Sequence, residues 1–150
     1  MAGSSQVDVV SEISIARPRP EVAAYACDPD NATAWYANIK SVHWKTPKPL
    51  DVGSQFAFTA KFLGRCLSYT YEVVELAPAR KFVMRTGEGP FPMETTYLWA
   101  DGPNETTTMT LRNRGEPSGF FGIAAPVLAK AMKRANAKDL ARLKAILQAH

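Results

Sequence analysis

The first third of the chain alternates between extended and turn-rich segments. Residues 7–15 are rich in β-branched side chains with partly alternating apolar and polar positions, which predicts a β-strand. Pro18 and Pro20 end it, because proline donates no main-chain hydrogen bond. Pro20 also suits the first turn of a helix over 21–27, and a second short helix is expected over 32–36, after the turn-rich residues 28–31.

A period of two begins at residue 55 and predicts a run of antiparallel strands. Phe56, Phe58, Ala60 and Phe62 would share one face of the first of them, with polar residues on the other. Turn signals at 64–65, around Pro78, at 87–92 and at 101–104 separate further alternating segments. The inward positions of those segments are mostly aromatic or methionine: Tyr69, Tyr71, Phe82, Met84, Met93, Tyr97, Trp99 and Met109.

The last segment has helical periodicity. Residues 123–148 predict a helix of about seven turns, whose apolar stripe comprises Leu128, Met132, Ala135, Leu143, Ile146 and Leu147. The simplest packing of these elements is an α+β fold in which a curved antiparallel sheet wraps around the C-terminal helix. One helix does not cover the whole aromatic face of such a sheet, so a cavity between the two is expected.

Composition supports one globular domain over residues 1–150, with residues 1–6 as a disordered N-terminus. The 150 residues are 46% hydrophobic and 21% charged, which excludes a disordered chain, and no apolar run reaches the roughly 20 residues of a membrane-spanning helix. Two isolated cysteines and the absence of a signal-peptide pattern predict a reduced, cytoplasmic protein. The net charge of +4 comes from residues 123–150, which contain six lysines and arginines but only one aspartate.

Several turn and packing motifs resemble a known family. They are Gly64-Arg65 before Tyr69-Thr70-Tyr71-Glu72-Val73, then Ala77-Pro78-Ala79-Arg80, Gly89-Pro90-Phe91-Pro92 and Asp139-Leu140-Ala141-Arg142-Leu143-Lys144. With the order of elements, they make the chain from about residue 7 to its end similar to the polyketide cyclase/dehydrase branch of the START-like superfamily. The resemblance implies a helix-grip fold around a hydrophobic cavity, and an apolar, aromatic, lipid-like or polyketide-like ligand. It carries over no catalytic signature.

The aromatic-rich face and its neighbours supply the candidate ligand-binding residues. Phe120 and Phe121, between glycines just ahead of the helix, could act as a flap over the cavity mouth or simply pack on the helix start. The full candidate set is Trp35, Tyr36, Phe56, Phe58, Phe62, Tyr69, Tyr71, Phe82, Met84, Met93, Tyr97, Trp99, Met109, Phe120, Phe121, Leu128, Met132 and Asn136.

Candidates for chemistry are sparse. The two histidines, His43 and His150, have no second His or Cys at ligand spacing, and no nucleotide-binding motif is present, so neither a metal nor a cofactor is expected. The weak catalytic candidates are Tyr97, Asn136 and His43, although His43 is read more simply as a surface histidine.

Other polar residues are interpreted as structural. Strand parity turns Glu72 and Glu94 away from the aromatic face, and Arg112 and Arg114 are expected at the surface as well. Asp139 could project into the cavity, but a surface pair with Arg142, three residues later, is the favoured interpretation. Cys27 and Cys66 are expected to be buried or half-buried small hydrophobic residues.

Three functions remain open. The favoured hypothesis is binding or transport of a hydrophobic small molecule between sheet and helix. The alternative is a cofactor-independent enzyme of the polyketide cyclase/dehydrase type, in which tyrosine and asparagine groups orient an enolate. The third is an interaction module that uses the basic helix on an anionic partner. Nucleic acid is not expected, because no aromatic residue lies among those basic residues to stack on bases.

Overall fold

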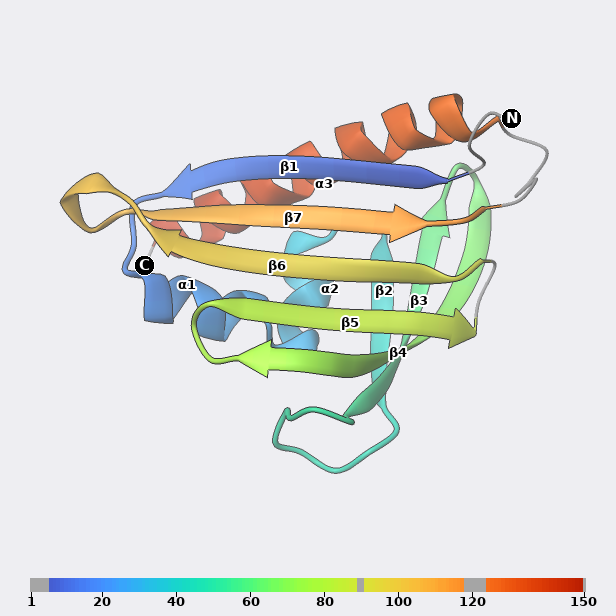
Figure 1. The fold of residues 1–150 in the computed structure, drawn as a ribbon, viewed down its shortest axis with the longest axis horizontal. Coiled ribbons are helices and arrows are strands. Elements are labelled where there is room, and N and C mark those ends of the chain that lie inside the picture. The colour runs from blue at the N-terminus through green and yellow to red at the C-terminus, as the bar shows by residue number, and fades with distance from the viewer. Residues whose placement is uncertain (1–5, 89–90, 118–123, 150) are drawn as a thin grey trace.

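The computed structural model describes residues 6–88, 91–117 and 124–149 (Figure 1). The predicted N-terminal tail, apart from Gln6, and the pair Phe120-Phe121 lie outside these residues. The strands are β1 (Val7–Ile15), β2 (Ile39–Trp44), β3 (Gln55–Phe62), β4 (Arg65–Ala77), β5 (Lys81–Glu88), β6 (Met93–Asp101) and β7 (Thr107–Gly115). The helices are α1 (Arg19–Ala26), α2 (Ala32–Trp35) and α3 (Ala125–Gln148), with 3-10 turns at Pro29–Asn31 and Pro103–Glu105.

The strands form an antiparallel sheet in the order β1-β7-β6-β5-β4-β3-β2. Strands β2 to β7 follow one another as a meander, and β1 closes the order by pairing with β7. In Figure 1 the sheet bends, so that β2 and β3 run across the direction of β5, β6 and β7, and α3 lies behind β1 and β7. The predicted helix-grip architecture is therefore confirmed.

Strand β2 was not expected from the sequence. Its six residues, Ile39–Trp44, have no clean alternation, and the strand is one of the two edges of the described sheet, where its main chain pairs only with β3. The register also shifts between Ile39 and Ser41. An edge strand with an irregular start buries few side chains, so its hydrophobic pattern is weak.

The inward face of the sheet matches the predicted parity. Phe56, Phe58 and Ala60 are buried and Phe62 is half-buried, while Thr59 and Lys61 are exposed. In β4 the alternation continues to Val73 and then breaks, because the pairing of β4 with β5 shifts register there. Such bulges bend a strand, and this one directly follows the last residue of β4 that pairs with β3.

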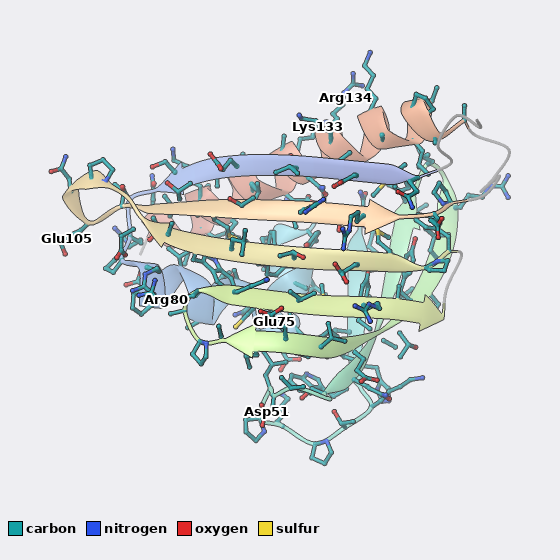
Figure 2. The ribbon with its side chains drawn as sticks, in the orientation of Figure 1. Asp51, Glu75, Arg80, Glu105, Lys133 and Arg134 are labelled. Atoms are coloured by element: carbon teal, nitrogen blue, oxygen red, sulfur yellow. The ribbon has the colours of Figure 1, made fainter. Side chains whose placement is uncertain are left out.

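Helix α3 buries one stripe against the sheet and leaves the rest in solvent. Its buried residues are Leu128, Met132, Asn136, Asp139, Leu140, Leu143 and Leu147. Lys133 and Arg134 are exposed and project outward (Figure 2). Among the described residues, no helix has the length and apolar character needed to span a bilayer.

The outer face of the sheet carries several paired charges. Arg112 binds the Asp8 carboxylate with two nitrogens at 2.8 and 2.6 Å, and Glu94 accepts hydrogen bonds from Arg85 and Arg114. The predicted surface positions of Glu94, Arg112 and Arg114 are thus confirmed. These pairs hold the pKa values of Asp8 and Glu94 below their ordinary range, chiefly through hydrogen bonds from the arginines.

Candidate functional site

A cavity of about 130 Å³ lies between the bent sheet and the middle of α3. Its wall is mostly apolar, and the polar groups come from the α2–β2 connection, from β4, β6 and β7, and from α3. The lining residues are Tyr36, Asn38, Ile39, Phe58, Ala60, Phe62, Leu67, Tyr69, Tyr71, Met84, Phe91, Met93, Thr95, Asn113, Met132, Ala135, Asn136 and Asp139. The expected space between sheet and helix is therefore present.

Half of this wall comes from residues singled out in the sequence. Those that line the cavity are Tyr36, Phe58, Phe62, Tyr69, Tyr71, Met84, Met93, Met132 and Asn136. The other described candidates lie in the packed core, outside the lining of this cavity: Trp35, Phe56, Phe82, Tyr97, Trp99, Met109 and Leu128. Strand parity separates inward from outward side chains, but it does not say where along the strand the helix fills the space.

The remaining lining residues were outside the ligand-binding set, although Asp139 had been considered as a residue that could project into the cavity. Ala60 and Leu67 share the inward parity of their strands and could have been found from it. Thr95 and Asn113 are paired opposite each other on β6 and β7, and the Thr95 hydroxyl donates to the Asn113 side-chain oxygen at 2.7 Å. Neither was predicted, because the polar candidates were titratable side chains and residues of the C-terminal helix.

Tyrosines provide neutral hydroxyl groups around the cavity. The Tyr36 and Tyr97 hydroxyl oxygens are 2.6 Å apart and share a hydrogen bond. Burial is the main cause that raises the pKa of Tyr36, Tyr69 and Tyr97 well above the ordinary value, and it raises the pKa of Tyr71 to about 12. At neutral pH these groups therefore remain protonated phenols.

Asp139 corrects the favoured prediction of a surface pair with Arg142. Its side chain is only 3% exposed, and its Oδ1 accepts a hydrogen bond from the main-chain N–H of Ala37 at 3.0 Å. The Arg142 Nε donates to the Ala34 carbonyl oxygen instead. Helix α2 packs on this part of α3, so the face that carries Asp139 is covered rather than solvated. Burial raises the pKa of the Asp139 carboxyl to about 6, although the Ala37 hydrogen bond and Arg142 oppose the shift.

Asn136 is one turn earlier on the same face of α3 and is 5% exposed. Its Nδ2 is buried and has no hydrogen-bond partner in the part of the chain that the structure describes. A buried amide donor without a partner costs about 1–3 kcal/mol. The structure places Asn136 in the cavity wall, where the sequence led us to expect it, and its amide nitrogen lacks a hydrogen-bond partner within the described residues.

Other sequence candidates lie elsewhere. His43 is exposed on β2 and does not line the cavity, and Glu72 is exposed and accepts a hydrogen bond from Gln55. Cys27 is half-buried, and burial raises the pKa of its thiol to about 11. Cys66 is exposed, contrary to the prediction, because its position in β4 faces outward. Within the described ranges, no three His, Cys, Asp or Glu side chains gather in a way that could hold a metal ion.

Solved structures with the same architecture come from bacteria and plants. A START superfamily protein from Mycobacterium smegmatis superposes with a TM-score of 0.82 at 13% identity, covering 94% of this chain and 97% of its own. The Zhui aromatase/cyclase from Streptomyces sp. R1128 gives 0.78 at 16% identity, with 95% and 94% covered. The major latex-like protein 151 of Panax ginseng gives 0.74 at 13% identity, with 95% and 97% covered. These likenesses show the START fold.

At the level of sequence, no curated protein matches the chain. A family model does match, over residues 6–148, and its description is polyketide cyclase / dehydrase and lipid transport. The match spans every strand and helix of the described structure and agrees with the superposed folds. The chain therefore belongs to the polyketide cyclase/dehydrase and lipid transport family.

Proposed function

We propose that the protein binds a compact, largely apolar small molecule in the cavity between the sheet and α3. The observation that carries this proposal is the cavity itself, whose wall is mostly aromatic, aliphatic and methionine side chains. Ligand sites commonly combine such a wall with a few polar groups that fix orientation. Here those polar groups are Asn136, Asp139 and the tyrosine hydroxyls.

The volume limits the size of the ligand. A cavity of about 130 Å³ is smaller than the roughly 300–1,000 Å³ of sites for drug-sized molecules. An apolar cavity of about 150 Å³ is enough to bind benzene. The cavity therefore has about the size of one aromatic ring or an aliphatic group of similar size, and because it is open to solvent a substituent on the ring can extend beyond it.

The test is a substitution on α3 that fills the cavity. Ala135 lines it and is half-buried, whereas Ala137 is exposed on the same helix. Titration of the wild-type protein with ethylbenzene, followed by NMR, is expected to give saturable shifts, and Ala135→Phe is expected to abolish them. Ala137→Phe is the matched control and should bind as the wild type does. Equal binding by both variants, or no binding by the wild type, would contradict the proposal.

A second candidate is a cofactor-independent enzyme acting on a keto or enol substrate. A specific observation favours it: Asp139 is a buried carboxyl with a pKa near 6, beside the amide of Asn136, in an otherwise apolar wall. A carboxyl with such a pKa can both accept and return a proton near neutral pH. Turnover of a poly-β-ketone by the wild type, lost in Asp139→Asn and Asn136→Ala, would support this function, and equal rates with and without protein would exclude it.

A further inference from the structure

A polar pair, Thr95 on β6 and Asn113 on β7, lies in the sheet side of the cavity wall. The two residues are opposite each other in the sheet, and both line the cavity. They are 3% and 8% exposed. The Thr95 hydroxyl donates a hydrogen bond to the Asn113 Oδ1 at 2.7 Å. Two uncharged polar side chains are therefore held together on the inward face of the sheet.

The hydrogen bond from Thr95 determines which end of the Asn113 amide is free. A threonine hydroxyl has one proton, and Thr95 gives it to the Oδ1, so the Nδ2 with its two protons points away from Thr95. Among the described residues the Asn113 Nδ2 has no hydrogen-bond partner, and unlike the Asn136 Nδ2 it is not sealed from the surrounding space. Asn113 thus has a donor that is both unpaired and accessible.

The neighbours of Asn113 explain where this donor faces. Asn113 shares the inward parity of the buried Leu111 on β7, so its accessible atoms lie on the cavity side of the sheet. Its inward neighbours besides Thr95 are Val9 on β1 and Leu111 and Gly115 on β7, and none of them has a side-chain acceptor. The partner that this donor lacks in the chain can therefore come from a molecule in the cavity.

We infer that the ligand presents a carbonyl oxygen, which accepts a hydrogen bond from the Asn113 Nδ2, and that Thr95 holds the amide in the orientation that this bond requires. Combined with the size and the apolar wall of the cavity, this assigns the ligand to the compact aryl ketones or aldehydes. The inference rests on the proposed function and adds to it the polar group of the ligand and the residue that recognises it.

Other functional groups match the Asn113 donor less well. An ammonium group has donors only and leaves the Nδ2 unpaired. A carboxylate accepts, but it would bring a second buried carboxyl into the wall that already contains Asp139, which is unfavourable. A hydroxyl accepts too, but it brings a proton that needs an acceptor of its own. A carbonyl oxygen accepts and brings no proton.

The experiment uses three probes of similar shape on the intact protein. They are acetophenone, α-methylstyrene, in which a methylene group replaces the carbonyl oxygen, and α-methylbenzyl alcohol, in which a hydroxyl replaces it. NMR titration gives a dissociation constant for each. The measured quantity is the affinity of acetophenone relative to that of α-methylstyrene. The two probes differ in their hydration in water, and this difference cancels when the relative affinity is compared between protein variants.

Asn113→Leu removes the donor and leaves a side chain of similar size. It should lower the relative affinity of acetophenone about tenfold, because the bound carbonyl then lacks its hydrogen bond. The loss for α-methylbenzyl alcohol should be only about two- to threefold, since its own proton offsets part of the gain in the wild type.

Thr95→Val tests the orienting role of the second member of the polar pair. It removes the hydroxyl that holds the Asn113 amide and should lower the relative affinity of acetophenone about two- to threefold. Thr96→Val is the matched control, because Thr96 is the next residue on β6 and lies on the outer face of the sheet. It should leave the relative affinity unchanged. Circular dichroism of each variant confirms that it is folded.

The outcomes separate this inference from the proposed function. A relative affinity of acetophenone that is the same in the wild type and in Asn113→Leu would overturn the inference, while binding of α-methylstyrene would leave the proposed function standing. An equal loss for the alcohol and the ketone would overturn the carbonyl assignment. Equal effects of Thr95→Val and Thr96→Val would overturn the orienting role of Thr95. Binding of none of the probes by the wild type would overturn both the inference and the proposed function.

Discussion

Replacing Asp139 by asparagine tests whether burial of this carboxyl, once it is ionised, lowers the free energy of unfolding. Burial raises the pKa of Asp139 from 3.8 to about 6. Between these values the folded protein keeps the proton while the unfolded chain has lost it. Stability therefore falls as the pH rises from about 4 to 6, and above pH 6 the full loss is present. Asparagine stays neutral, so Asp139→Asn does not show this loss.

The magnitude follows from the shift. About two pKa units, at 1.36 kcal/mol each, correspond to about 3 kcal/mol as an upper limit. The shift already includes the Ala37 hydrogen bond and the charge of Arg142, which oppose the effect of burial, so neither is subtracted again. At pH 7.5 the variant should thus be more stable than the wild type by up to about 3 kcal/mol, and at pH 4 about equal to it.

The assay is urea unfolding of both proteins at intervals from pH 4 to pH 8. The difference between the two curves removes the contributions of groups such as Asp8 and Glu94, whose lowered pKa values act in the opposite direction. Asp51→Asn is the matched control, because Asp51 is exposed in the loop before β3 (Figure 2) and is far from α3 in the fold. A difference between wild type and Asp139→Asn that does not change with pH would refute the reasoning.

Three further changes probe the core and the strand ends. Phe82→Ala removes a ring that is 1% exposed and should lower the free energy of unfolding, measured in urea, by about 3–5 kcal/mol. A loss below about 1 kcal/mol would contradict this prediction, because it would mean that neighbouring side chains fill the space that the ring leaves. Tyr97→Phe leaves the Tyr36 hydroxyl without this partner and should cost about 1–2 kcal/mol; an unchanged urea midpoint would contradict it. Gly115→Ala places a Cβ 2.7 Å from the Pro92 carbonyl oxygen and should cost about 1–3 kcal/mol in thermal unfolding, whereas an unchanged Tm would show that the β6–β7 end adjusts.

Local periodicity was enough to find most of the elements. Strands β1 and β3 to β7, both short helices and α3 all carry patterns set by neighbouring residues, because side chains alternate along a strand and return every 3.6 residues in a helix. Strand β2 was not predicted from these patterns. It is an irregular edge strand whose sequence lacks a regular alternation of apolar and polar residues, and its main-chain pairing with β3 makes it a strand.

The same patterns predicted which face of the sheet a side chain occupies. The inward Phe56, Phe58 and Phe62, and the outward Arg112 and Arg114, are where their parity predicts. Cys66 also lies on the side of β4 that its parity predicts, and the expectation that it is buried or half-buried was wrong because it relied on residue type rather than position.

Tertiary structure alone decided which inward residues border empty space. Tyr97 and Tyr71 share the aromatic face, yet Tyr71 lines the cavity while Tyr97 does not. The burial of Asp139 depends on α2 covering α3, which no local pattern records. The sequence by itself determined the elements and their apolar faces, since these depend on residues close along the chain. The bend of the sheet and the placement of α3 against it arise from contacts between distant residues, and they determine the cavity and its polar pair.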